Sequence, residues 1–175
     1  ITNEFSQKNF SISSLIILIT NQIYNKFNLS YSILVSFHDK KLFNNKNLFI
    51  LDKINWLEIL FRSKQLTSKI SNYDIIHIHG IWAPIQLLSI LTCYKNNKKF
   101  LIHPHGMLLS AALKSGGSVK FLFKITFLYI AKFLIKGKVN FVSITNQETN
   151  AIKKFFPLSN VIEISNPIPF EKNNF

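Results

Sequence analysis

Residues 74–103 read DIIHIHGIWAPIQLLSILTCYKNNKKFLIH, and this stretch decides the fold class. Residues 74–79 and 99–103 are short apolar runs of the kind that form buried strands. Residues 84–94, between them, have the length and apolar content of a helix and begin with a proline, which is tolerated in a helical first turn. Two strands joined through a helix form a βαβ unit with parallel strands. The stretch therefore predicts an α/β protein.

The same alternation of apolar runs and polar breaks continues along the rest of the chain. It predicts further strands at residues 31–37, 140–144 and 160–164, and helices at residues 11–27, 55–70, 118–135 and 146–156. Ile1 and Thr2 fit the tail of a first strand that leads straight into a polar loop, so most of that strand would be missing. We therefore expect a Rossmann-like fold, in which helices cover both faces of a doubly wound, mainly parallel sheet.

The length of the chain, 175 residues, fits one domain with a hydrophobic core. The sequence begins with Ile1 and its one methionine is Met107, so we expect an excised or incomplete segment. Cys93 is the one cysteine, which leaves no disulfide framework and makes a reducing cytoplasm the expected location.

The chain carries a formal net charge of +13, from 21 Lys and Arg against 8 Asp and Glu. Such a charge suits anionic partners: nucleic acid, phosphorylated substrates or a membrane surface. Heavy use of Lys, Asn, Ile and Phe is also what an AT-rich coding sequence produces, so both interpretations stay open. The phenylalanines argue against nucleic acid, because those in residues 121–133 lie in a helix-like run rather than between basic residues on a strand.

Residues 119–139, VKFLFKITFLYIAKFLIKGKV, form the longest apolar stretch. Lysines at positions 120, 124, 132, 136 and 138 interrupt it, which argues against a transmembrane span. Lys120, Lys124 and Lys132 fall close to one helical face. We therefore expect an amphipathic helix that either packs on the sheet or lies on an anionic bilayer.

Polar, glycine-containing or proline-containing clusters follow four of the expected strands. Ligands of open parallel sheets bind beyond the carboxyl ends of the strands, where loops and helix amino-termini meet. We therefore expect the ligand site at this edge of the sheet, built from four clusters: HIHGIW at residues 77–82, HPHGM at 103–107, TNQE at 145–148 and SNP at 165–167.

The two His-x-His pairs of this edge raise the possibility of a metal site. Positions i and i+2 of a strand face the same way, and imidazole is a common zinc ligand. Ligating histidines, however, normally need carboxylates behind them, and these loops offer Glu148 and the more distant Asp74 alone. His77 lies inside an apolar run, so we expect it to be a satisfied core or near-core residue. We therefore expect no metal.

Hydrolytic chemistry fits the sequence poorly. A glycosidase generally needs two carboxyl groups at the scissile bond, and the crevice loops supply Glu148 alone. There is no G-x-S-x-G element for a serine triad and no phosphate-binding P-loop. What remains is His105 followed by Gly106, which lets the backbone approach a ligand closely. This pair suits orientation and electrostatics better than covalent catalysis.

Four segments in this order and spacing resemble a known family: DIIHIHGIWAP, HPHGMLLSAALKSGG, SITNQETNAIKKF and VIEISNPIPF. They are similar to the amino-terminal domain of retaining glycosyltransferases of family 4, which have the B-type fold of two Rossmann-like domains. The resemblance covers residues 74–170, and its most specific segment is HGMLLSAALKSGG. The earlier residues match by element order alone.

The resemblance implies transfer of a sugar from a nucleotide-sugar to an acceptor hydroxyl, with retention at the anomeric carbon. The first domain of such enzymes contacts the acceptor, the second holds the nucleotide-sugar co-substrate, and no metal or other cofactor is needed. His105 matches the histidine at the reaction centre and is the expected catalytic residue. The expected substrate-binding residues are His79, Gly80, Trp82, Gly106, Met107, Thr145, Glu148 and Asn166.

Residues 1–170 would then be the acceptor-side domain, and residues 171–175 the start of the connection to an absent nucleotide-sugar domain. The chain alone would be inactive. Its first loop, QKNFS at residues 7–11, lacks the glycine pair that relatives have there. We expect a saccharide or lipid-linked acceptor of the cell envelope, at the inner face of the plasma membrane. The alternative is a non-catalytic membrane-surface or interaction protein derived from such a domain.

Overall fold

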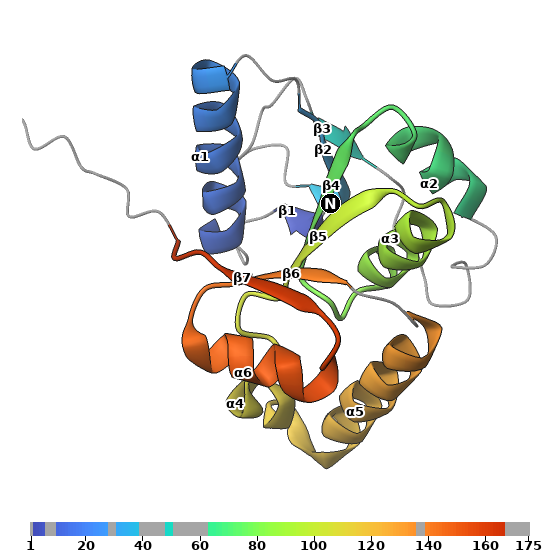
Figure 1. Ribbon diagram of the computed structural model, residues 1–175, viewed down its shortest axis with the longest axis vertical. Coiled ribbons are helices and arrows are strands. Elements are labelled where there is room, and N and C mark those ends of the chain that lie inside the picture. The colour runs from blue at the N-terminus through green and yellow to red at the C-terminus, as the bar shows by residue number, and fades with distance from the viewer. Residues whose placement is uncertain are drawn as a thin grey trace, which may run out of the picture.

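The structure is a computed structural model that describes residues 2–5, 10–27, 31–38, 48–50, 63–135 and 139–166. Strands from these residues form one sheet in the order β3-β2-β1-β4-β5-β6-β7, and every neighbouring pair is parallel. This confirms the prediction of a Rossmann-like, doubly wound parallel sheet (Figure 1). The strands are β1 Thr2–Phe5, β2 Ile33–His38, β3 Leu48–Ile50, β4 Ile75–His79, β5 Lys99–His103, β6 Asn140–Ser143 and β7 Asn160–Glu163.

Helices cover both faces of the sheet. Because βαβ connections are right-handed, reversing the direction of strand order moves the connecting helices to the opposite face. In Figure 1, α1 lies on one side of the sheet, whereas α2 and α3 lie on the other. Helices α5 and α6 belong to the same layer as α2 and α3. The helices are α1 Phe10–Phe27, α2 Ser63–Ile70, α3 Pro84–Lys95, α4 Ser110–Lys114, α5 Gly117–Leu134 and α6 Asn146–Phe155.

The main core lies between β4, β5 and β6 and the layer of α3, α5 and α6. Ile76 and Ile78 of β4 are buried in it, beside Ile102 of β5. The alternate residues of β4 point to the other face, where Ile75 and His77 are exposed. His77 is therefore not in the core, although its ring is satisfied by a contact with His103: the strand is buried on one face, and its histidines lie on the other.

Several element boundaries differ from the sequence-based expectation. The first strand does not give way to a loop after Thr2 but continues to Phe5, because the backbone of Asn3–Phe5 pairs with β2 on one side. The short elements β3 and α4 were not expected, and α2, Ser63–Ile70, is the described part of the helix expected at residues 55–70. Residues 51–62, most of the first loop and residues 171–175 lie outside the described residues.

The expected amphipathic helix corresponds to α5, and it packs on the domain. Phe127, Leu128 and Ala131 of α5 are buried in the main core. None of the described helices is long and apolar enough to cross a bilayer.

Candidate functional site

The histidine-rich loops follow strands next to the point where the strand order reverses. The chain leaves β1 toward β2 and β3 in one direction, and proceeds from β4 to β7 in the other, so β1 and β4 flank the reversal. In α/β sheets the ligand crevice opens at the carboxyl ends of the strands at such a point. Thr2 of β1 pairs with His79 of β4, which pairs with His103 of β5. The parallel register thus brings the strand-end histidines beside the expected crevice.

Four histidines form two hydrogen-bonded pairs across β4 and β5. His77 Nδ1 lies 3.0 Å from His103 Nε2, and His79 Nδ1 lies 2.9 Å from His105 Nε2. In each pair the ring centroids are 5.1 Å apart, much farther than the nitrogens, so the rings meet by their edges. In such a contact one nitrogen donates its proton and the other offers a lone pair.

The two pairs stack on each other, since the His79 and His103 centroids are 4.6 Å apart with an interplanar angle of 23°. Burial lowers the pKa of His103 to about 3 and that of His105 to about 4, because a charged imidazole is poorly solvated there. Burial, with repulsion from the neighbouring imidazoles, lowers the pKa of His79 well below its usual range. These three rings are therefore neutral at pH 7, and each can donate one hydrogen bond and accept another.

The turn after β5 places the His105 ring next to the His79 ring. Met107 N donates to Pro104 O at 3.2 Å, and both central residues have positive φ, 53° at His105 and 76° at Gly106. Positive φ at both centres is the pattern of a type I′ turn. A non-glycine residue in this region costs roughly 1–2 kcal/mol, so other contacts must hold His105 there. The strain marks the turn as a candidate functional element.

Glu148 supplies one of these contacts. Its side chain is 1% exposed, Oε1 accepts a hydrogen bond from Gly106 N at 2.5 Å, and Oε2 accepts one from Ile144 N at 2.8 Å. Glu148 N donates to Thr145 Oγ1 at the start of α6. The carboxylate therefore joins the His105 turn to the β6–α6 connection, and its contacts favour a positioning role over the expected contact with substrate. The T-x-x-E spacing, typical of a capping box, could have indicated this role.

Gln86, which the sequence analysis missed, organises the other loop. Its side chain is buried; Nε2 donates to His79 O at 2.5 Å and Oε1 accepts from Ala83 N at 2.8 Å. Gly80 has a φ of 85°, and a Cβ atom there would lie 2.3 Å from Gln86 Nε2, so this position requires glycine. The available signal was a glutamine three residues after Ala83, in the glutamate or glutamine position of a capping box.

The remaining expected substrate-binding residues divide into those near the histidines and those away from them. Met107 lies near Gly80, since its Cε is 3.2 Å from where a Cβ of Gly80 would stand. Trp82 instead packs edge-to-face on Phe127 of α5, with centroids 5.6 Å apart. Thr145 caps α6, and Asn166 is exposed beyond β7, with no contact to the histidines among those described.

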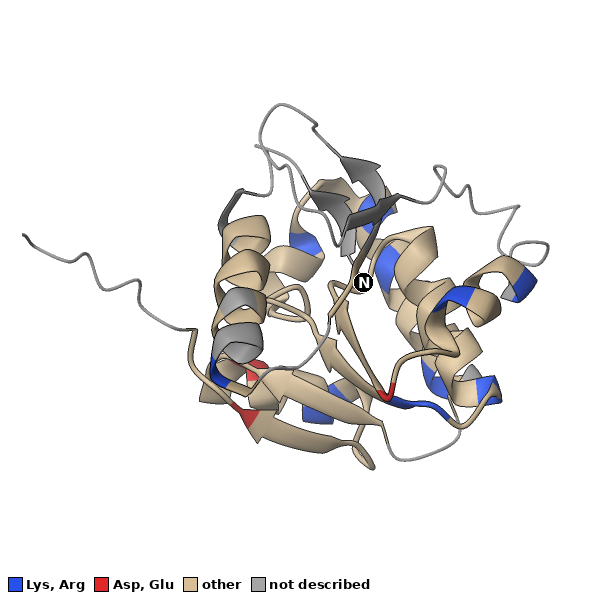
Figure 2. Ribbon diagram, turned by 90° about the horizontal axis from the view of Figure 1, so that it is seen from above, with Lys and Arg blue, Asp and Glu red and all other residues tan. Residues whose placement is uncertain are grey.

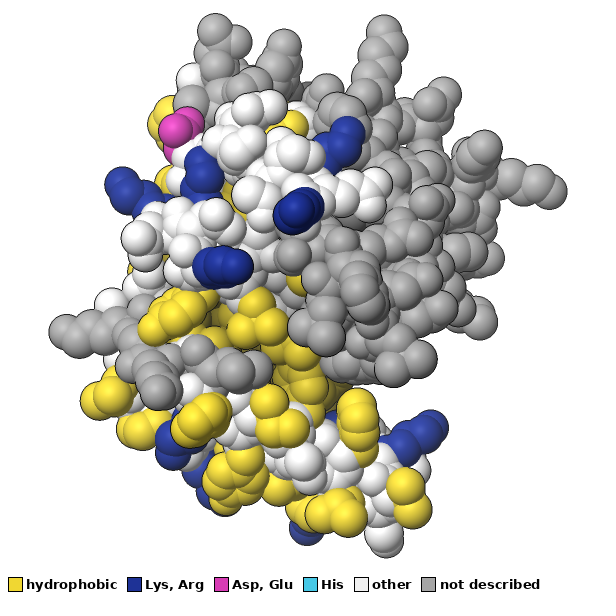
Figure 3. Space-filling view, turned by 90° about the vertical axis from the view of Figure 1, so that its right-hand side faces the viewer, with side chains coloured by type: hydrophobic (Ala, Val, Ile, Leu, Met, Phe, Trp, Pro, Cys, Tyr) yellow, Lys and Arg dark blue, Asp and Glu magenta, His cyan; other side chains and the backbone are white. Residues whose placement is uncertain are grey.

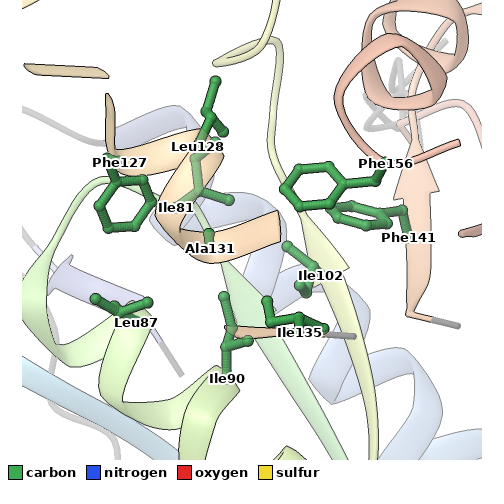
Figure 4. Close-up of a pocket in the computed structure, with 10 residues that line it drawn as sticks. All are labelled: Ile81, Leu87, Ile90, Ile102, Phe127, Leu128, Ala131, Ile135, Phe141 and Phe156. Atoms are coloured by element: carbon green, nitrogen blue, oxygen red, sulfur yellow. The ribbon is translucent and has the colours of Figure 1, made fainter. Parts of the chain in front are cut away.

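Two other kinds of site find no support in the described residues. Among them, no group of three or more His, Cys, Asp or Glu side chains is placed to hold a metal ion. A cavity of about 20 Å³ lies under α5, lined by hydrocarbon side chains, and has room for about one water molecule. It is too small for a substrate. Figure 4 shows its lining: Ile81, Leu87, Ile90, Ile102, Phe127, Leu128, Ala131, Ile135, Phe141 and Phe156.

No family model, curated protein or solved structure matches the chain. The neutral imidazoles lie beside the two turns that contain Gly80 and Gly106, both with positive φ. They can orient a polar ligand by hydrogen bonding. No carboxylate with a described side chain is placed for covalent catalysis: Glu148 is occupied, Asp74 precedes β4, and Glu163 ends β7 and accepts from Thr149.

Replacing Glu148 with Gln should lower the free energy of unfolding by about 2 kcal/mol. The amide group would turn a donor toward one of the two backbone N–H groups and leave it without an acceptor. Urea denaturation measures the loss, and hydrogen exchange at Gly106 should become faster in the folded chain. The exposed Glu163 is the matched control, and its change to Gln should alter stability by less than about 0.5 kcal/mol. Equal effects of the two substitutions would contradict the positioning role.

The lowered histidine pKa values predict a loss of stability on acidification. Between pH 6.5 and about 4 the unfolded chain binds more protons than the folded chain, so the free energy of unfolding falls as pH decreases. Each such histidine contributes a slope of up to about 1.4 kcal/mol per pH unit. Urea denaturation from pH 7 to 5 should show a shallower slope for His103→Gln than for the unchanged chain. Parallel slopes would show that His103 is not held neutral by the fold.

Proposed function

We propose that the chain is the acceptor-side domain of a retaining glycosyltransferase. It would act with a nucleotide-sugar domain to move a sugar onto a hydroxyl of a saccharide or lipid-linked acceptor. One observation carries the proposal: His79-Gly80 and His105-Gly106 lie on neighbouring strand ends of a parallel sheet, joined by the contact between His79 and His105. This is the edge where α/β folds bind ligands, and it agrees with the resemblance of the same two segments to family 4.

His105 is the proposed catalytic residue. Its neutral ring can donate a hydrogen bond to the donor sugar or its phosphate and so stabilise the charge that develops on the leaving group. His79 would be a positioning residue, because its hydrogen bond to His105 Nε2 fixes the orientation of that ring. The role is electrostatic rather than nucleophilic, in keeping with the absence of an available carboxylate among the described side chains.

The second candidate is a non-catalytic membrane-surface or interaction protein that keeps the fold of such a domain. The apolar side chains exposed on α5 favour it, since exposed apolar patches often mark interaction surfaces. The two candidates differ in one measurable respect, because only the first requires His105 for turnover.

Replacing His105 with Asn, in a protein that carries this domain and its nucleotide-sugar domain, should lower kcat on the order of a hundredfold. Asn is preferable to Ala because it tolerates the positive φ of this position better. The measurement is the rate of nucleotide release in the presence of donor and acceptor.

His105→Gly is the matched variant, because it removes the imidazole and also relieves the backbone. It should lose a similar fraction of kcat without a lower melting temperature. If both variants kept near-normal turnover with unchanged melting temperatures, the catalytic role would be rejected. If turnover recovered in the Gly variant alone, His105 would matter only through the turn.

A further inference from the structure

Helix α5 exposes a mainly apolar surface on the side that faces away from the core. At 100° per residue, the buried Phe127, Leu128 and Ala131 lie on one side of the helix. Five large apolar residues fall on the opposite side, with exposed fractions from 51% to 85%. We call these residues the α5 stripe: Val119, Leu122, Tyr129, Ile130 and Phe133.

The lysines of α5 lie toward the packed side or at its margins, not within the stripe. Lys124 points to the body of the domain, where Nζ donates to Ala112 O at 2.6 Å and to Ser115 O at 3.2 Å. Lys120 lies on the same side as Phe127 but is exposed, because it stands in the first turn of α5, and Lys132 is exposed at the margin next to Leu128. The helix is therefore apolar on the outward face, where a surface helix is normally polar. Exposed apolar faces of this kind often mark interaction surfaces.

The surroundings of the α5 stripe are strongly basic. From residue 75 to residue 147 the sequence contains nine lysines and no Asp, Glu or Arg. Figure 2 shows lysines spread over the helices and acidic residues in few places. In Figure 3 hydrophobic side chains gather over the lower part of the molecule, where α5 lies, with lysines around them. A partner that covers this surface must be apolar where it meets the stripe and anionic around it.

We propose that the α5 stripe docks on an anionic lipid bilayer. The helix would lie parallel to the membrane plane, with its apolar side chains at the boundary between headgroups and acyl chains. Lys120 and Lys132 could extend their ammonium groups to lipid phosphates, and Tyr129 suits the interface because its ring is apolar and its hydroxyl is polar. A second copy of the chain is the less favourable occupant, because it would bring two surfaces of the same charge together. The proposal does not depend on the transferase reaction.

Vesicle co-sedimentation of the full chain tests this docking. We expect binding to phosphatidylcholine vesicles that contain phosphatidylglycerol, little binding to phosphatidylcholine alone, and weaker binding as salt is raised. Leu122→Asn should weaken binding on the order of tenfold, because it removes an apolar side chain from the lipid contact. Leu158→Asn is the matched control: Leu158 is 69% exposed and Leu122 is 66% exposed, but Leu158 lies in the turn after α6.

A second pair of variants tests the electrostatic part. Lys120→Gln with Lys132→Gln should weaken binding by about fivefold for each lysine, whereas Lys64→Gln with Lys154→Gln, exposed on α2 and α6, should change it far less. The proposal is overturned if the chain binds neither kind of vesicle, or if Leu122→Asn and Leu158→Asn bind equally. It is also overturned if the chain elutes as a dimer that Leu122→Asn converts to a monomer, since a second copy would then cover the stripe.

Discussion

The two hydrogen bonds that the Glu148 carboxylate accepts from Gly106 and Ile144 hold the candidate site together. A buried carboxylate is costly unless it is fully hydrogen-bonded, so Glu148 requires both backbone partners to stay in place. Its position in the first turn of α6 adds the favourable field of a helix amino-terminus. The backbone in turn depends on Glu148. It keeps Gly106 next to the β6–α6 connection and so helps to hold His105 in a backbone conformation that it would otherwise leave.

The parallel register of β4 and β5 brings the His105 turn and the end of β4 together at one edge of the sheet. Because His79 lies opposite His103, the histidines of two distant segments meet on one face of the sheet, at the end where the loops begin. Gln86 holds the backbone after His79, as Glu148 holds the backbone after His105. Both turns are thus fixed by buried side chains that bond to their backbone. The imidazoles remain neutral because a charged ring would be poorly solvated and would meet three others.

Local patterns were enough to predict the strands at residues 74–79 and 99–103, the helix that begins at Pro84, and the carboxyl edge as the place where polar clusters meet. They could not show that His77 is exposed or that it contacts His103, because both facts depend on which face of β4 is covered. The sequence also could not show which side of α5 is buried, because apolar residues and lysines occur around the whole helix. Tertiary packing buries the side with Phe127. Glu148 matched a substrate-binding pattern, but it is buried and both of its carboxylate oxygens accept hydrogen bonds from backbone N–H groups.

The tautomers of the imidazoles test the account most directly. In a contact between Nδ1 of one neutral ring and Nε2 of another, one nitrogen must carry hydrogen and the other must not, so His79 and His105 must share the same tautomer. Nitrogen-15 NMR of the histidine rings in the folded chain at pH 7 can read both protonation and tautomer. The proposed donor role of His105 requires two neutral rings that are both protonated at Nδ1, so that His79 Nδ1 donates to His105 Nε2 and His105 Nδ1 keeps a hydrogen for the ligand. Protonation of both rings at Nε2, opposite tautomers, or an imidazolium at either residue would contradict it.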